Sequence, residues 1–293
     1  MPSYVLYAIA AAILNSFLGI YQKLVSKYSV TNFYAFTFYS FFLPIFFTPF
    51  LFLFFGFVSP IAALRFLIPQ VLFFFLGSCL LYSVIFKNEA SNINPLFPLK
   101  LVFVPFIAYF ILGEVFSTTV YIFILFIICG AILVSIDESF RPAAFFKKGN
   151  LILILALFSF AMADVLAGKT TQIISPFQTL AWQIVFLFPF SLPFWFLKRK
   201  AKTGETRRNI LAIFGMSFML IAVVSLLYQA FAQNVTLSNS IAMVNGPLTL
   251  LLIVIIGKTN PHFLENHTLK IYLIRIGGSL LMYVAALGII VNL

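Results

Sequence analysis

Charged side chains are scarce in this sequence of 293 residues: Asp, Glu, Lys and Arg together make up only 9%, against roughly 25% in soluble domains. Acids are the scarcest, with seven Asp and Glu against 18 Lys and Arg. Apolar residue types instead reach 63%, and Phe alone occurs 40 times. This composition excludes an ordinary soluble domain and predicts an integral membrane protein.

Residues that form common catalytic and metal sites are also few. Cys79 and Cys129 each lie inside an apolar run, where a cysteine is most simply a small packed residue. His262 and His267 share one segment with Glu265, at a spacing too loose for a helical metal pair. Gly-rich phosphate loops, paired-carboxylate motifs and serine nucleophile elbows are missing from the sequence. We therefore expect no enzyme activity, no metal and no cofactor, and without an ATP site the chain cannot be a primary pump by itself.

Apolar runs near 20 residues recur along the whole chain, and each is long enough to cross a hydrocarbon layer of about 30 Å as a helix. The first run is followed, not preceded, by Lys23 and Lys27, so we expect a membrane helix there and not a secretory signal. Polar, Pro and Gly clusters separate the runs. The predicted fold is all-α with ten transmembrane helices, at 4–25, 33–55, 67–87, 95–113, 118–136, 150–170, 177–197, 210–233, 240–257 and 269–291.

The chain divides near its middle, where a polar linker at 141–149 separates five helices in 1–140 from five in 150–293. The halves correspond weakly. An offset of 147 takes Ser91-Asn92 to Ser238-Asn239 and Gly130 to Gly277, and an offset of 144 takes "TNF" at 31–33 to "SPF" at 175–177. Because five is odd, a second copy with the same fold must be inserted upside down. Inverted repeats place a binding site at their interface near the bilayer midplane, which points to a transporter.

One stretch, "INPLFPLKLVFVPFIAYFILGEVFSTTVYIFILFIICGAILVSID", is similar to the fourth and fifth helices of EamA-type members of the drug/metabolite transporter superfamily. Its motif is a Pro-bearing helix that ends in Leu112-Gly113-Glu114, a short turn, and a helix with an internal glycine, Gly130. The start of the chain also resembles the family, whose first helix ends in a lysine, here Lys23. The second half lacks the Leu-Gly-Glu motif. The resemblance implies ten helices in two repeats and a secondary carrier, in particular an exporter of small metabolites or drug-like molecules.

Glu114 directly follows a long apolar run, and two roles are open for it. Gly113 permits a tight exit from the preceding helix, so the carboxylate can lie at the start of the next helix, where the dipole favours negative charge. In that case the acid is structural. The alternative is a direct role in ion coupling.

Ionisable groups inside the apolar runs are the best candidates for a site, because each costs about 3 kcal/mol in hydrocarbon unless it faces a cavity or a partner. Asp164 lies well inside the sixth candidate helix, and a pair with Lys100 or Lys23 would cancel its charge in a central cavity. Asp164 and Glu89 are the candidates for proton coupling. The alternative for the polar residues is that they only tie helices together by hydrogen bonds. The predicted substrate-binding residues are Asn15, Gln22, Tyr39, Tyr82, Lys100, Asp164, Trp182, Gln229 and Asn245.

Basic residues concentrate in the segments that follow odd-numbered helices, which predicts that both termini lie outside the cell. The family resemblance implies the opposite, with both termini cytoplasmic. We expect a small-molecule substrate and membrane lipids as partners, no nucleic acid, a monomer or homodimer, and a place in the plasma (inner) membrane. The alternative functions are an integral-membrane lipid-modifying enzyme, for which only Asp164 with Lys100 or Lys169 could supply reactive groups, and a lipid-flipping subunit.

Overall fold

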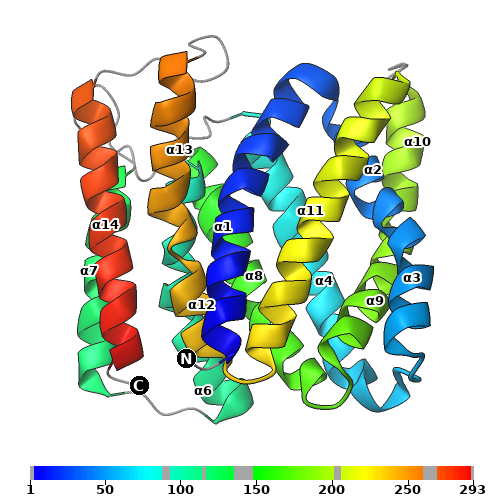
Figure 1. Ribbon diagram of the computed structural model, residues 1–293, viewed down its shortest axis with the longest axis horizontal. Coiled ribbons are helices and arrows are strands. Elements are labelled where there is room, and N and C mark those ends of the chain that lie inside the picture. Colours follow the sequence, from blue (N-terminus) through cyan, green and yellow to red (C-terminus); the bar gives the residue numbers. More distant parts are fainter. Residues whose placement is uncertain are drawn as a thin grey trace.

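The computed structural model describes residues 3–87, 93–113, 117–134, 148–200, 206–259 and 269–291, and every regular element within these ranges is a helix. The long helices lie side by side with their axes roughly vertical in Figure 1. Within these described ranges eight apolar helical segments are long enough to cross a membrane, and Leu96–Leu112 and Tyr121–Val134 are shorter apolar helices. The chain is therefore an all-helical integral membrane protein.

The elements follow one another along the chain in two series. The first series is α1 (Ser3–Leu24), η1 (Val25–Ser29), α2 (Phe33–Phe42), η2 (Leu43–Phe47), α3 (Thr48–Phe55), η3 (Ile61–Ala63), α4 (Leu64–Ile85), η4 (Asn94–Leu99), α6 (Lys100–Leu112) and α7 (Thr118–Val134). The second is α8 (Lys148–Thr171), α9 (Pro176–Leu187), η6 (Phe188–Ser191), α10 (Leu192–Lys200), α11 (Arg207–Phe231), α12 (Val235–Ala242), α13 (Asn245–Thr259) and α14 (Leu269–Val291).

Three of the predicted helices are interrupted. The second and the seventh contain short 3₁₀ turns, η2 and η6, which begin around Pro44 and Pro189. Proline lacks the N–H that an α-helix needs at an interior position, so the chain tightens there before the helix resumes. The ninth predicted helix, 240–257, is wrong in its extent. α12 starts at Val235 and ends at Ala242, and two residues, Met243 and Val244, separate it from α13.

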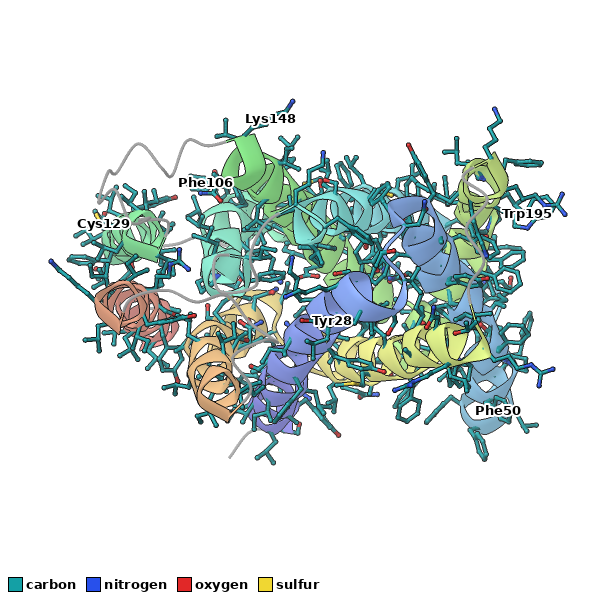
Figure 2. All side chains as sticks on the ribbon, turned by 90° about the horizontal axis from the view of Figure 1, so that it is seen from above. Tyr28, Phe50, Phe106, Cys129, Lys148 and Trp195 are labelled. Carbon is teal, nitrogen blue, oxygen red and sulfur yellow. The ribbon has the colours of Figure 1, made fainter. Side chains whose placement is uncertain are left out.

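The helices pack in pairs that are distant in the sequence. α4 lies against α8, α1 against α11, and α7 against α14. Seen from above, α7 with Cys129 lies at one end of the long axis and α10 with Trp195 lies at the other (Figure 2). Large side chains on the outside of the bundle, such as Phe110 at 81% exposure, form the surface expected to face lipid.

Two glycines allow α7 and α14 to approach closely. A Cβ added to Gly130 would lie 2.6 Å from the carbonyl oxygen of Gly278, and one added to Gly278 would lie 2.7 Å from that of Gly130. Gly277 has open space at the same position. The glycine that packs against Gly130 is therefore Gly278 and not its neighbour Gly277, the residue that the offset of 147 pairs with Gly130.

The two ends of the bundle differ in charge. Both chain termini lie at the lower edge of Figure 1, where α1 begins and α14 ends. This end, the sparse face, carries Arg65 in the first turn of α4 and Lys169 in the last turn of α8. The opposite end, the cation-rich face, lies toward the viewer in Figure 2, where Tyr28 is labelled. Its cations are Lys23, Lys27, Lys87, Lys148, Lys198, Arg199, Lys200, Arg207, Arg208 and Lys270.

Candidate binding site

A cavity of about 110 Å³ lies between α1, α4, α6, α8, α11 and the break that separates α12 from α13. This is room for several water molecules. Six of the predicted residues line the cavity, namely Asn15, Gln22, Tyr82, Lys100, Asp164 and Asn245. They come from five different helices, and aromatic rings of Phe74, Phe97 and Phe160 complete the wall beside them.

An ion pair is the most polar feature of this cavity. The Lys100 ammonium donates to the Asp164 carboxylate over 2.6 Å, and both side chains are largely buried, at 9% and 14% exposure. Asp164 is the only acidic side chain within the described ranges. A single charge in the interior of a membrane protein is costly, so each of these groups requires the other.

The local structure brings the two partners together. Lys100 is the first residue of α6, directly after the 3₁₀ turn η4 that contains Pro98, and Asp164 lies in the uninterrupted helix α8. Lys23, the other expected partner of Asp164, instead donates to the carbonyl oxygen of Ile85 over 2.7 Å at the C-terminus of α4. A cation is favourable at that helix end because of the dipole.

The break between α12 and α13 supplies polar groups to the same cavity. Asn239 of α12 lies beside the Asp164 carboxylate. Asn245, the first residue of α13, is 5% exposed, and its side-chain oxygen has no hydrogen-bond partner. Ser16 of α1 donates to the Asn245 main-chain carbonyl over 3.2 Å, which ties the break to α1. The unpartnered oxygen can accept a hydrogen bond from a bound molecule or from water.

A buried cluster of hydrogen bonds, most of which the sequence pattern did not predict, adjoins the cavity on the side of the chain termini. Gln70 Nε2 donates to Gln183 Oε1 (2.8 Å) and to the Tyr228 hydroxyl (3.0 Å). Thr170 donates to Gln70 Oε1 over 2.8 Å, and Tyr228 donates to Gln183 Oε1. We call these four residues the polar cluster. Gln70 and Gln183 are single amides in apolar runs, so the criterion that selected Asn15 could have found them.

The opposite side of the cavity is aromatic. Tyr82 of α4 packs edge-on against Phe36 with ring centroids 5.1 Å apart, and Phe41 lies 6.1 Å from it. Phe36 is fully buried and also meets Phe86 at 5.4 Å. We call these four residues the aromatic cluster. A smaller void of about 30 Å³ lies beside Phe41 and Tyr82.

Three of the predicted site residues do not line the cavity. Tyr39 lies at the cation-rich face, where its hydroxyl accepts a hydrogen bond from Lys198. Trp182 lies near the sparse face and donates to the carbonyl oxygen of Val58 over 2.8 Å. Gln229 follows Tyr228 on α11 but is not among the lining residues. Polar or aromatic residue type within an apolar run predicted these positions, but the rotation of each helix against its neighbours decides which residues face inward.

The comparison with protein families decides the identity of the first half. Residues 2–136 match the EamA-like transporter family. The first half of this chain is an EamA-like transporter unit. The resemblance seen in the sequence is thereby confirmed for this half, and it is consistent with the drug/metabolite transporter superfamily.

Comparisons over the whole chain add the fold. One solved structure, described only as the crystal structure of a protein, aligns with a TM-score of 0.66 over 97% of both chains at 15% identity. At that identity the likeness shows the fold alone. A search of curated proteins finds no match.

The motif residues of the EamA-like unit are only partly described. Gly113 follows Leu112 and ends α6 in the left-handed conformation at φ 74°, which glycine adopts without strain and which matches the expected tight exit. Glu114 and Glu89 lie outside the described residues, so their predicted roles stay predictions. The described residues hold no group of three or more His, Cys, Asp or Glu side chains that could bind a metal ion.

Proposed function

We propose that this protein is a secondary carrier of small metabolites or drug-like molecules, working as an exporter by alternating access, and that its ten helical segments form two inverted repeats. In such a pair of repeats, a contact between a helix of the first half and a helix of the second half should recur between the two equivalent helices of the opposite halves. α4 contacts α8, and α11 contacts α1. In both contacts, the third membrane helix of one half packs against the first membrane helix of the other half.

Local features recur at equivalent places and support the same proposal. Pro44 and Pro189 begin 3₁₀ turns in the second element of each half. The helices before these turns, α2 and α9, are each capped by a side chain, from Asn32 and from Ser175. Tyr82 and Tyr228 line the cavity from the third element of each half. A duplicated unit accounts for all three features together.

The Lys100–Asp164 pair is the observation that carries the proposed transport role. Charged groups within a membrane segment are retained where they face a wet cavity or a substrate path. Asn15, Gln22 and Asn245 add amide groups that can bind a polar solute, and the aromatic walls suit its apolar part. The proposed substrate therefore lies beside the ion pair, in contact with both halves of the chain.

The ion pair also offers a route for proton coupling. When Asp164 takes up a proton, its carboxyl group no longer holds the Lys100 ammonium, which then turns to the substrate or to water in the cavity. Export against a gradient follows if the proton binds while the cavity faces outside and leaves while it faces the cytoplasm. The protein needs no ATP for this cycle.

Transport by purified protein in proteoliposomes tests the function. A thermal-shift screen of amino acids, nucleosides and cationic dyes first identifies a ligand, whose uptake is then measured across a range of pH values. Asp164→Asn should bind the ligand and lose the pH dependence of transport. Lys169→Gln, on the same helix but outside the cavity, is the matched control and should behave as the wild type. An unchanged pH profile in Asp164→Asn would contradict the coupling role.

The lipid-modifying alternative finds less support. It requires two reactive groups at one bilayer depth that can attack a lipid, whereas Asp164 and Lys100 hold each other in a hydrogen bond. We further propose the plasma (inner) membrane as the location, since the carrier would exchange solutes between cytoplasm and exterior. Whether the protein acts as a monomer or a homodimer stays a prediction.

A further inference from the structure

The cation-rich face carries a strong positive charge. Of the cations with described side chains, ten lie on this face, two lie on the sparse face, and Lys100 and Arg275 are buried inside the bundle. Six of the seven acids lie outside the described residues and the seventh, Asp164, lies in the interior, so the acids are too few to offset all ten of these cations. Clustered cations of this kind create a potential that attracts anions.

Aromatic rings place these cations at the level of lipid headgroups. The Arg199 guanidinium lies over the Trp195 ring at 4.0 Å, and Lys198 lies over the Tyr39 ring at 4.0 Å. Trp and Tyr are enriched where a membrane meets water. On the same helix Phe196 is 58% exposed, so the cations adjoin a surface that suits acyl chains. A phosphate on a lipid headgroup is therefore within reach of the cations.

We propose that the cation-rich face binds anionic phospholipid headgroups of the cytoplasmic leaflet, and that both chain termini consequently lie on the other side of the membrane. Basic residues near the ends of membrane helices stay on the cytoplasmic side, and that leaflet holds the anionic lipids. The proposed orientation is opposite to the one that the family resemblance implies. It does not depend on what the central cavity carries.

Cysteine labelling tests the orientation. In a variant with Cys79 and Cys129 replaced by alanine, Tyr28→Cys introduces an exposed thiol on the cation-rich face, and Ser59→Cys introduces one on the sparse face. Spheroplasts are treated with a membrane-impermeant maleimide. Ser59→Cys should react before lysis, and Tyr28→Cys should react only after lysis, with a ratio of about tenfold or more. Stronger labelling of Tyr28→Cys before lysis, or equal labelling of both, would overturn the proposal.

The two tryptophans test the lipid partner separately. Trp182→Phe leaves Trp195 as the reporter of the cation-rich face, and Trp195→Phe leaves Trp182 near the sparse face as the matched control. Each variant is reconstituted in phosphatidylcholine vesicles with a minor fraction of phosphatidylglycerol. In one preparation the brominated lipid is phosphatidylglycerol, and in the other it is an equal amount of phosphatidylcholine. Brominated phosphatidylglycerol should quench Trp195 about twofold more than brominated phosphatidylcholine does.

The controls distinguish a preference for anionic lipid at the cation-rich face from a preference of the whole protein. Trp182 should be quenched equally by the two brominated lipids. In the Trp182→Phe background, Lys198→Gln, Arg199→Gln and Lys200→Gln together should bring the Trp195 ratio down to about one. Equal quenching of Trp195 in the protein with all cations present, or the same preference at Trp182, would refute lipid binding at the cation-rich face.

Discussion

The two ends of the central cavity are bounded by different kinds of contact. On the side of the chain termini, Tyr228 belongs to the polar cluster, whose hydrogen bonds join α4, α8, α9 and α11. On the other side, Tyr82 belongs to the aromatic cluster, whose rings come from α2, α4 and the turn that follows α4. Tyr82 and Tyr228 themselves are equally buried, at 3% exposure each.

The difference affects how each end could open. Hydrogen bonds are directional and strong in a low dielectric, and a buried polar group that loses its partner costs roughly 1–3 kcal/mol. Edge-to-face ring contacts contribute about 0.5–1.5 kcal/mol each and tolerate sliding. In an alternating-access cycle we therefore expect the polar cluster to open in one step when water enters, and the aromatic cluster to open gradually as helices shift.

The largest effect should come from the ion pair, which belongs to neither end. Lys100→Met leaves the Asp164 carboxylate buried without its cation, and we expect a loss of about 4 kcal/mol in the free energy of unfolding. Thermal unfolding in detergent measures it. The double variant Lys100→Met with Asp164→Leu should recover most of the stability while remaining inactive in transport. A stable Lys100→Met protein would show that the pair is not needed by the folded state.

Phe36→Ala should have the next largest effect and weakens the aromatic end only. The side chain is fully buried between Tyr82 and Phe86, so its removal leaves a cavity and costs about 3 kcal/mol. Phe110→Ala is the control, because Phe110 is 81% exposed on the lipid-facing surface and should change little. If both variants unfolded at the wild-type temperature, the aromatic cluster would not be a packed unit.

Gln70→Leu weakens the polar end. Gln70 is fully buried and bonds to three partners, so its loss leaves donors and acceptors of Thr170, Gln183 and Tyr228 less well paired, and we expect a cost of about 2 kcal/mol. Gln229→Leu, at a half-buried position on α11 outside the cavity, is the matched control. Equal unfolding temperatures for the two variants would argue against a cooperative cluster.

A pair of tyrosine variants compares the ends most directly, with the smallest expected effects. Tyr228→Phe removes a hydroxyl that bonds to both glutamines and should cost about 1 kcal/mol. Tyr82→Phe keeps the ring that packs on Phe36 and should cost less than half as much. Thermal unfolding of both proteins in the same detergent gives the difference. A larger shift for Tyr82→Phe would reverse the comparison.

Part of the candidate site could be predicted because its chemistry is rare in this chain. Asp164 and Lys100 stand out as ionisable groups in apolar runs, and the cost of a bare charge in hydrocarbon requires that such groups meet a partner. The choice between Lys100 and Lys23 could not be made from the sequence. It depends on η4, which brings Lys100 to the level of Asp164, and on the C-terminus of α4, whose carbonyl binds Lys23.

The positions of other residues could not be predicted from the sequence. Tyr39 and Trp182 have the residue types of a binding site, but they lie near the two faces of the bundle, where their polar atoms bind Lys198 and Val58. Arg275 is 2% exposed in α14 and was not predicted, although it is an ionisable group inside an apolar run like Asp164 and Lys100. Distance along the chain does not give depth in the bilayer once helices break or tilt.

The sequence by itself determined that this chain spans a membrane, where most of its helices lie, and which end of the bundle holds the cations. These properties follow from the length, hydropathy and charge of contiguous segments, so they are local. Only the tertiary structure decided which amides share the cavity with the Lys100–Asp164 pair and which belong to the polar cluster beside it. Inward-facing positions depend on how each helix is rotated against its neighbours and on where 3₁₀ turns interrupt it, and packing between distant segments sets both.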